Sequence, residues 1–380
     1  MNKFELGTGL SRPFFDFSFL FPRQHISLCS NRVVMTENSL KINGVCYEVE
    51  RLKDSASLLS ITDGDNAFAD FLLAWFDDSD FVMGNTSGST GTPKPIRLSK
   101  DTMRESARRT NDFFRIGETS SLLLCLSTQY IAGKMMVVRA LVSGCNLCLE
   151  KPSSAPLLQG NFDLVSMVPM QVYSLRRSSD GASRLSHVRN LLVGGSPLAQ
   201  EDANWLRSLS LHTYVSYGMT ETVSHVALAD LNDLSTDGML VYHALPSVSF
   251  KQDDRGCLVI SADYLSSEPF VTNDVVDLLT ETSFLWKGRW DNVINTGGVK
   301  VHPEILEKKV ASLISRPFYF VGLPDPKYGQ MVVLKIEGFP YPTFALEYFL
   351  QKTLSPYEMP KEIHFLDHFE RTESGKIKRK

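Results

Sequence analysis

A short run of hydroxyl-bearing and glycine residues carries the strongest chemical signal in this 380-residue chain. It follows the apolar residues 81–83 and reads Thr86-Ser87-Gly88-Ser89-Thr90-Gly91-Thr92-Pro93-Lys94. Hydroxyl groups and glycine N–H groups can surround the oxygens of a polyphosphate, and the closing lysine adds a positive charge. Clusters of Ser, Thr and Gly are commonly solvated turns, so the rest of the chain must decide between a turn and a phosphate site.

The run differs from the phosphate loop of P-loop nucleotidases, in which Gly-Lys is followed by Ser or Thr. Here Pro93 precedes Lys94 and Pro95 follows it. Prolines on both sides prevent a helix from starting at this point, which excludes a phosphate site built on a helix N-terminus. We therefore expect the loop to bind phosphate with its own backbone and hydroxyl groups.

A second group of residues, Tyr217-Gly218-Met219-Thr220-Glu221, follows a strand-like stretch. Glu221 could hold Mg²⁺ against ATP oxygens, Thr220 could donate to the α-phosphate, and Tyr217 offers an aromatic face for a base. A Thr-Glu pair at a strand end is also a common surface feature. Upstream, Gly194-Gly195-Ser196 ends another strand-like stretch and would let a flat ligand approach the backbone closely.

Three later segments extend this set. Thr272-Asn273-Asp274 places a carboxylate where it could accept both hydroxyls of a ribose, although an Asx turn is the simpler interpretation of these residues alone. Residues 288–304 form a long polar segment that includes Gly297-Gly298. Near the end, Lys376 follows a glycine. A basic tail is usually solvated, but this lysine stands on a predicted tight turn from which it could swing into a site.

The elements that must position these residues alternate in type. Residues 101–115 carry an apolar face at helical spacing and predict an amphipathic helix. Strand-like apolar runs follow at 121–126, 146–149, 164–168, 191–193 and 212–216, with helix-compatible segments between them, which favours an α/β architecture. Residues 237–280 alternate as in a small β-rich subdomain. Helices at 303–313 and 343–354 with strands at 318–321 and 331–336 predict a compact α+β domain at the end.

The motifs occur in one order between residues 86 and 376, and together they resemble those of the adenylate-forming superfamily, within it the acyl-CoA ligases. The resemblance implies an α/β fold with a large N-terminal AMP-binding domain, residues 1–290, that contains the β-rich subdomain at about 237–280. It also implies a small, mobile α+β lid domain, residues 291–380, with Asp291 at the hinge.

The resemblance further implies a two-step reaction that uses ATP, Mg²⁺ and coenzyme A. A carboxylate attacks the α-phosphorus of ATP to give an acyl-adenylate and pyrophosphate, and the thiol of coenzyme A then displaces AMP. Lys376 is expected at the reacting carboxylate and α-phosphate, beside Thr220 and Glu221. The loop Thr86–Lys94 is expected at the β- and γ-phosphates, Asp274 and Arg289 at the ribose, and Gly297, Gly298 and Lys300 at coenzyme A or phosphate.

The acid is suggested by a narrower resemblance. Small members of the superfamily with a short N-terminal region include the o-succinylbenzoate–CoA ligases of menaquinone biosynthesis, and Ser166–Gln171 resembles their Ser-Leu-Val-Pro-Thr-Gln segment. Ortho-succinylbenzoate carries a second carboxylate that stays unreacted, and a buried carboxylate needs a cation or hydrogen-bond donors. Lys134, beside Gln129 and Tyr130, is predicted to supply them, with Ser216 as a further pocket residue. The alternative for Lys134 is a solvent-facing helix lysine.

Three positions depart from the superfamily pattern. Asn273 stands where a glycine is usual, Glu370 where a proline is usual, and Gln129–Lys134 replaces an aromatic–His pair. None of these changes removes a predicted catalytic group, but the last leaves the identity of the acid open. A ligase for another aryl or short acyl acid, and a non-catalytic AMP-binding protein, therefore remain as alternatives.

Composition excludes other classes of protein. The formal net charge of −4 argues against a nucleic-acid-binding surface, and no run approaches the ~18 apolar residues of a membrane span. Six scattered cysteines favour a cytoplasmic protein with reduced thiols, and Cys145-x-x-Cys148 has no second pair that would make a zinc site. The expected partners are small molecules: a carboxylic acid, ATP and coenzyme A.

Overall fold

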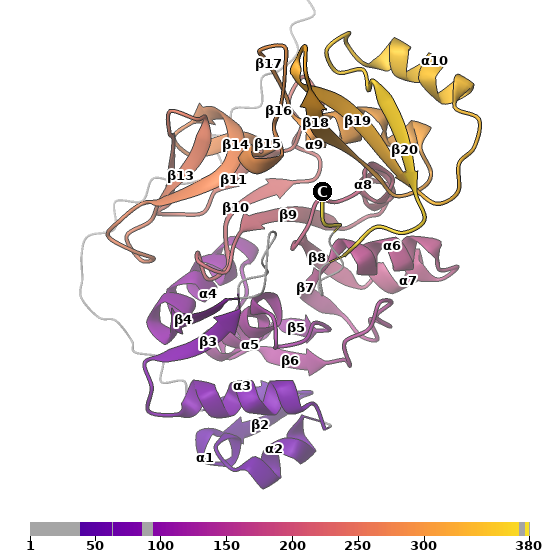
Figure 1. The fold of residues 1–380 in the computed structure, drawn as a ribbon. Helices are drawn as coiled ribbons and strands as arrows, with labels where there is room; N and C mark the ends of the chain where they lie inside the picture. Colours follow the sequence, from indigo (N-terminus) through magenta and orange to yellow (C-terminus); the bar gives the residue numbers. More distant parts are fainter. Residues whose placement is uncertain (1–38, 63, 86–93, 372–376, 380) are drawn as a thin grey trace, which may run out of the picture. The chain divides into compact units, whose positions relative to one another are not determined.

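The computed structural model describes residues 39–62, 64–85, 94–371 and 377–379. These residues form mixed α/β structure with three sheets, and most of their strands are labelled in Figure 1. No helix within the described ranges is long and apolar enough to cross a membrane.

The largest sheet has 13 strands in the order β12-β13-β14-β15-β11-β10-β9-β8-β7-β5-β6-β1-β2. Its central part is parallel, because β5 pairs with β6 and β7, β7 pairs with β8, and β8 pairs with β9. These strands are β5 Ser121–Leu124, β6 Asn146–Leu149, β7 Phe162–Met167, β8 Val188–Val193 and β9 His212–Gly218. Each lies within a few residues of its predicted position, which confirms the α/β class.

Helices precede and connect the parallel strands. They are α4 Lys100–Phe114, α5 Ile131–Ser143, α6 Pro169–Arg177, α7 Gly181–Leu185 and α8 Gln200–Arg207. The predicted helix at 101–115 is confirmed as α4: the Ser99 hydroxyl accepts a hydrogen bond from the Thr102 amide at 3.4 Å, and Arg115 ends the helix in the left-handed conformation. Strands β7 and β8 are buried almost throughout, as expected for a parallel sheet covered on both faces.

The predicted β-rich region continues this sheet in antiparallel fashion. It contains β10 His225–Asp230, β11 Val241–Ala244, β12 Ser249–Gln252, β13 Cys257–Ser261, β14 Phe270–Thr280 and β15 Ser283–Arg289. Strand β10 pairs with both β9 and β11, so the region is hydrogen-bonded to the α/β part. The parallel part and the antiparallel part therefore belong to one continuous sheet.

The elements before the parallel strands were not predicted from the sequence. They are β1 Ser39–Ile42, β2 Val45–Glu48, α1 Val49–Leu52, α2 Ser55–Ile61 and α3 Asn66–Phe76. Two further strands, β3 Phe81–Asn85 and β4 Pro95–Ser99, form a separate antiparallel pair. Buried side chains of α3, such as Phe68 and Leu72, belong to the same apolar cluster as those of α4 and α5.

The C-terminal part has its own sheet and its own core. Strands β16 Ile294–Thr296, β17 Val299–Val301, β18 Phe318–Asp325 and β19 Gly329–Glu337 lie in the order β17-β16-β19-β18, and β20 Glu362–Leu366 pairs with β19. Helices α9 Pro303–Val310 and α10 Phe344–Thr353 pack on this sheet around Leu306, Phe320 and Leu350. The predicted helix at 303–313 ends as α at Val310 and continues as a short 3₁₀ turn, Ala311–Leu313.

Candidate active site

The ends of the predicted phosphate loop are held together by the β3–β4 hairpin. Asn85 is paired with Pro95, so the two ends of the intervening segment lie opposite each other. Residues 86–93, which include Thr86–Thr92, lie outside the described residues. Lys94 is described and exposed. The role of the loop in binding phosphate stays a prediction.

The Thr220–Glu221 motif lies beside the start of that loop. It occupies the turn between β9 and β10, where the Thr220 hydroxyl donates to the Asn85 carbonyl oxygen at 3.4 Å. The side chain of Glu221 is exposed. Val223 has a φ of 66°, an uncommon conformation for a β-branched residue. Such strain is characteristic of turns whose shape matters for function.

The glycines after β8 lie against the predicted acyl pocket. A Cβ atom added at Gly194 would lie 2.2 Å from the hydroxyl oxygen of Ser216, so a side chain at position 194 would force this hydroxyl to move. The Ser216 hydroxyl donates to the carbonyl oxygen of Val193 at 3.3 Å. Gly195 has a φ of 90°, which places it in the region that favours glycine. Gly194, Gly195 and Ser216 are therefore brought together, with Ser196 next in the chain.

The predicted ribose carboxylate is held on several sides. Asp274 is buried, with 8% of its surface exposed. Its Oδ2 accepts a hydrogen bond from the Tyr217 hydroxyl at 2.8 Å, and its Oδ1 accepts one from the Trp286 indole N–H at 3.1 Å. The Arg289 guanidinium lies 3.8 Å from Oδ1. The structure thus joins three predicted nucleotide residues, and it adds Trp286, which sequence reasoning missed.

Burial keeps the tyrosine of this group protonated. Desolvation, with the nearby Asp274 charge as a further cause, raises the pKa of Tyr217 well above its ordinary value. Its ring makes edge-on contacts with Phe284 and Tyr242, at centroid distances of 5.1 and 6.0 Å. Tyr217 is therefore a fixed hydrogen-bond donor. Its predicted contact with a base stays a prediction.

The predicted hinge is tied to the end of β15. The Asp291 carboxylate accepts hydrogen bonds from Arg289 at 3.2 Å and from Asn273 at 3.4 Å. Asn273 is the residue that replaces the usual glycine, so this departure supplies a contact with the hinge. Within the next segment, the ammonium of Lys300 lies 4.8 Å from the centre of the Trp290 ring. Gly297 and Gly298 form the left-handed turn between β16 and β17, with φ values of 60° and 82°.

Lys376 falls outside the described residues, but its neighbours on both sides are described. Arg371 forms a β-bridge with Ile377, and the Lys378 amide donates to the Glu370 carbonyl oxygen at 2.8 Å. The Arg379 guanidinium makes two hydrogen bonds to the carboxylate of Glu307 in α9, at 2.7 and 2.6 Å. The segments on the two sides of residues 372–376 are thus joined to each other, and Arg379 joins them to α9.

Lys134 lies on α5 and is half-buried. Its ammonium donates to the Thr128 carbonyl oxygen at 2.6 Å and lies 5.0 Å from the centre of the Phe71 ring in α3. Burial lowers the pKa of Lys134, while the charge of Asp70 acts in the opposite direction. Lys134 is therefore only partly exposed, and its predicted place in the acyl pocket stays a prediction. Its predicted neighbours Gln129 and Tyr130 are both exposed.

A different cation on α5 is fully enclosed. Arg139 is 2% exposed, and no carboxylate lies within ion-pair distance of it among the described residues. Its Nη2 donates to the Ser224 hydroxyl at 3.0 Å, its Nη1 contacts the Met136 sulfur at 3.3 Å, and its Nε has no hydrogen-bond partner. Burial lowers the pKa of Arg139 to about 10, so the guanidinium is charged at neutral pH.

Arg139 was not predicted as a site residue, because its neighbours in the sequence are typical of a buried helix. It stands among Met135, Met136, Val137, Val138 and Ala140, in a helix with buried residues all round. The charge itself could have indicated a functional role, since an arginine within an apolar helix is rarely buried without a partner. A buried guanidinium with an unused N–H is suited to an anionic group of a ligand.

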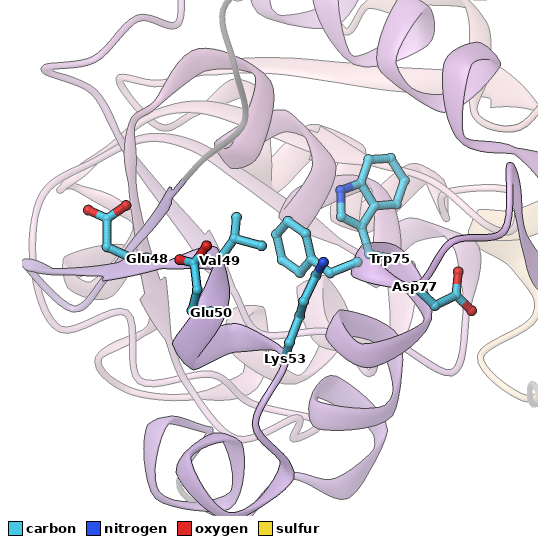
Figure 2. Close-up of a pocket in the computed structure, with 7 residues that line it drawn as sticks. Glu48, Val49, Glu50, Lys53, Trp75 and Asp77 are labelled. Atoms are coloured by element: carbon cyan, nitrogen blue, oxygen red, sulfur yellow. The ribbon is translucent and has the colours of Figure 1, made fainter.

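One surface cavity is lined by none of these residues. It has a volume of about 460 Å³ and lies between the segment Glu48–Lys53 and the end of α3. Figure 2 shows its lining side chains, with Glu50 and Lys53 on one side and Trp75 and Asp77 on the other. None of the predicted site residues lines this cavity, so it has no part in the site proposed below.

The donor set is compatible with a magnesium ion brought by ATP. Glu221 offers an exposed carboxylate beside Thr220, and no ion pair involving it is present among the described residues. Magnesium bound to a nucleotide commonly uses one or two protein carboxylates, together with phosphate oxygens and water. A single accessible glutamate fits that pattern. Within the described ranges, no cluster of three or more His, Cys, Asp or Glu residues could hold a metal ion independently.

Known proteins resemble this chain in sequence and in fold. Residues 35–254 match the family model described as AMP-binding enzyme. A 2-succinylbenzoate–CoA ligase of Lactococcus lactis subsp. lactis (strain IL1403) is 26% identical over 351 residues, which cover 87% of this chain and 77% of the relative. O-succinylbenzoate coenzyme A synthetase from Bacillus subtilis, in complex with ATP and magnesium ion, shares the fold with a TM-score of 0.65 at 20% identity, over 78% of this chain and 68% of that one.

A third relative is more similar in sequence. The crystal structure of an acyl-CoA synthetase (AMP-forming)/AMP-acid ligase II-like protein from Dyadobacter fermentans DSM 18053 matches at 36% identity with a TM-score of 0.56. The match covers 83% of this chain and 93% of that chain. With more than half of its residues matched by the family model, this chain belongs to the AMP-binding enzyme family, among its AMP-forming acyl-CoA synthetases.

Proposed function

We propose that this protein is an o-succinylbenzoate–CoA ligase of menaquinone biosynthesis. In the first step a substrate carboxylate oxygen attacks the α-phosphorus of ATP, the bond to the pyrophosphate oxygen breaks, and acyl-adenylate and pyrophosphate form. In the second step the sulfur of coenzyme A attacks the acyl carbon, the thiol loses its proton, and AMP leaves with the electrons of the broken bond.

The observation that carries the choice of acid is the buried guanidinium of Arg139. A buried charge without a counter-ion is costly, and a substrate carboxylate would compensate it. Its hydrogen-bond partner Ser224 is three residues after Glu221, in the turn that carries the proposed catalytic residues. Ortho-succinylbenzoate supplies a second carboxylate that does not react, so one group can pair with Arg139 while the other is activated.

Lys134 is the weaker candidate for the same task. Its ammonium already donates to the Thr128 carbonyl oxygen and lies over Phe71. Arg139 has an N–H group with no hydrogen-bond partner and is more deeply buried. The names of relatives such as the Lactococcus lactis ligase support an acid with two carboxylates.

The remaining residues are assigned to charge neutralisation and positioning. Lys376 is proposed to neutralise the reacting carboxylate and the α-phosphate, assisted by the Thr220 hydroxyl. The loop Thr86–Lys94 would bind the β- and γ-phosphates, and Asp274 and Arg289 the ribose. Glu221 would hold the magnesium ion, which supplies charge stabilisation on the phosphate oxygens. Lys300 and the Gly297-Gly298 turn are proposed to contact coenzyme A.

A cytoplasmic location is part of this proposal. ATP and coenzyme A are the required co-substrates, and the cysteines within the described ranges, Cys46, Cys125, Cys145, Cys148 and Cys257, form no disulfide. The proposed domain boundary near residue 290 is supported by the separate core of the C-terminal sheet. The small domain would alternate between two positions in the two steps.

Pyrophosphate release with a panel of acids tests the proposal. The panel contains o-succinylbenzoate, two monoacid analogues that each lack one of its carboxylates, and unrelated aryl and short acyl acids. We expect o-succinylbenzoate to release pyrophosphate in the first turnover without coenzyme A, and to be preferred over both analogues by at least about tenfold. Equal rates with the analogue that lacks the unreacted carboxylate would reject the proposed acid and favour the alternative of a ligase for another acyl acid.

A further inference from the structure

The carboxylate of Asp274 is held by one donor on each oxygen. The Trp286 indole donates to Oδ1 at 3.1 Å, and the Tyr217 hydroxyl donates to Oδ2 at 2.8 Å. These two donors come from β15 and β9, two strands separated by β11 and β10 in the sheet order. Because they bind different oxygens, together they fix the rotation of the carboxylate about the Cβ–Cγ bond.

We propose that Trp286 is a positioning residue for nucleotide selection, which holds Asp274 in the orientation that accepts the 2′- and 3′-hydroxyls of ATP. The proposal rests on the proposed role of Asp274 at the ribose. Each carboxylate oxygen has two lone-pair directions, and each protein donor uses one of them. One direction on each oxygen is left for a ribose hydroxyl, so the two hydroxyls can be accepted side by side.

The local strand geometry explains how Trp286 reaches Asp274. Strands β14 and β15 pair Val276 with Trp286, but a bulge shifts the register so that Asp274 stands opposite Arg289. A bulge strengthens the twist and changes the direction of nearby side chains. The indole then extends diagonally across the pair toward Oδ1. Arg289, the direct cross-strand neighbour of Asp274, stays 3.8 Å from the same oxygen and contributes charge.

The N–H group of Trp286 is the part of the residue that matters for this role. Asp274 is buried, so a lost donor leaves one carboxylate oxygen without compensation and lets the group rotate. Tyr217 cannot replace the missing donor, because its hydroxyl is already bound to Oδ2. A phenylalanine at position 286 keeps an aromatic ring in the sheet but removes the N–H.

Discrimination between ATP and its deoxy analogues tests the inference in the whole enzyme. For the wild-type protein, W286F and W205F, kcat/KM for adenylate formation is measured with ATP, 2′-deoxyATP and 3′-deoxyATP. Trp205 lies in α8 and forms no hydrogen bond with Asp274 in the described part of the chain. W205F therefore serves as the matched control. We expect W286F to raise the KM for ATP by about tenfold and to reduce the preference for ATP by a similar factor, with a smaller change in kcat.

The remaining variants distinguish the different ways in which the inference could be wrong. W286H, which restores a ring N–H, is expected to recover part of the preference. If W286F does not fold, W286L, which also lacks the N–H, is compared with W286H instead. A preference for ATP that is unchanged in W286F while D274N loses it would overturn the inference and leave the ribose role of Asp274 intact. A preference that is unchanged in D274N would instead reject the ribose role itself. A loss of the same size in W205F would show that the effect is a general consequence of removing a tryptophan, and would also overturn the inference.

Discussion

Arg139 and Ser224 are joined by a hydrogen bond of 3.0 Å between Nη2 and Oγ, although 85 residues separate them in the chain. The bond connects the interior of α5 to the turn that carries Thr220 and Glu221. An enclosed cation therefore stands next to the proposed reaction centre. The other hydrogen bond that this guanidinium makes in the described residues is to the sulfur of Met136, on the same helix.

Replacing Arg139 by leucine is expected to weaken binding of o-succinylbenzoate strongly. Loss of a buried charge pair costs on the order of 2–5 kcal/mol, so KM should rise by at least about 30-fold while KM for ATP changes little. The apoprotein should be as stable as the wild type or more so, because an uncompensated buried charge is removed. Adenylate formation and thermal unfolding are the measurements. Lys134→Met is the matched control, and a larger effect from it would move the carboxylate site to Lys134.

Lys376→Ala is expected to separate the two half-reactions. Adenylate formation should fall by about 10²–10³, because the lysine is proposed to neutralise charge that develops in that step. The thioester step, measured with supplied acyl-adenylate and coenzyme A, should keep its rate, because the small domain is proposed to present other residues in that step. Lys378→Ala is a nearby control that should leave both rates unchanged. An equal loss in both half-reactions for Lys376→Ala would contradict its proposed role.

The hinge prediction concerns backbone freedom at Asp291. Proline restricts φ, so Asp291→Pro should favour one position of the small domain and slow one half-reaction by about tenfold or more. Asp291→Ala removes the hydrogen bonds from Arg289 and Asn273 but leaves the backbone free. It should change both half-reactions by less than about threefold. Identical rates for wild type and Asp291→Pro would show that rotation at this residue is not required.

His225 should make the fold sensitive to acid. Burial, with the charge of Arg139 as a further cause, lowers its pKa well below 6.5, so the folded protein holds it neutral. Below about pH 6.5 the unfolded chain takes up a proton that the folded chain does not. The free energy of unfolding should then fall by up to about 1.4 kcal/mol per pH unit from this residue.

Urea unfolding between pH 7.5 and 5.5 measures this effect. His225→Gln should show a smaller loss of stability over that range than the wild type. His212→Gln changes an exposed histidine at the start of β9 and should follow the wild-type curve. If His225→Gln also follows the wild-type curve, the buried histidine does not titrate as stated.

Gly218 is expected to tolerate no side chain. A Cβ atom there would lie 2.2 Å from the Ser224 carbonyl oxygen and 2.6 Å from the His225 Cα, both backbone atoms of the neighbouring segment. Gly218→Ala should therefore cost about 1–3 kcal/mol in the free energy of unfolding. Gly117 has nothing within 4 Å of its ideal Cβ position and no positive φ, so Gly117→Ala should be neutral or slightly stabilising. Equal urea midpoints for the two variants would contradict the predicted difference in stability.

The sequence predicted elements well where periodicity and end signals agree. Helix α4 has an apolar face, a serine cap and a defined last turn, and its bounds were predicted to within one residue. The parallel strands β5 to β9 were found from short apolar runs, since strands covered on both faces contain few polar residues. The nucleotide motifs were recognised by their order and resemblance, and the structure brings Tyr217 and Asp274 together.

Other parts of the site depend on contacts that no local pattern contains. Helix α5 is apolar on most sides, so periodicity could not show whether Lys134 or Arg139 faces the interior. Trp286 reads as an ordinary strand aromatic, and its bond to Asp274 depends on a bulge that the sequence does not mark. The order of the motifs along the chain was therefore enough to recognise them. Which other side chains contact the motif residues depends on how the helices and strands pack.

The antiparallel pairing of β10 with both β9 and β11 has a practical consequence for dividing this enzyme into fragments. Residues 231–240 connect β10 to β11, and each of these strands is held by a further neighbour, β9 or β15. A cut in that connection would leave the pieces joined by backbone ladders and by buried apolar side chains. Two separately produced fragments that meet there would carry the two edges of the β10–β11 pairing, and activity regained on mixing them would show that this pairing forms between separate chains.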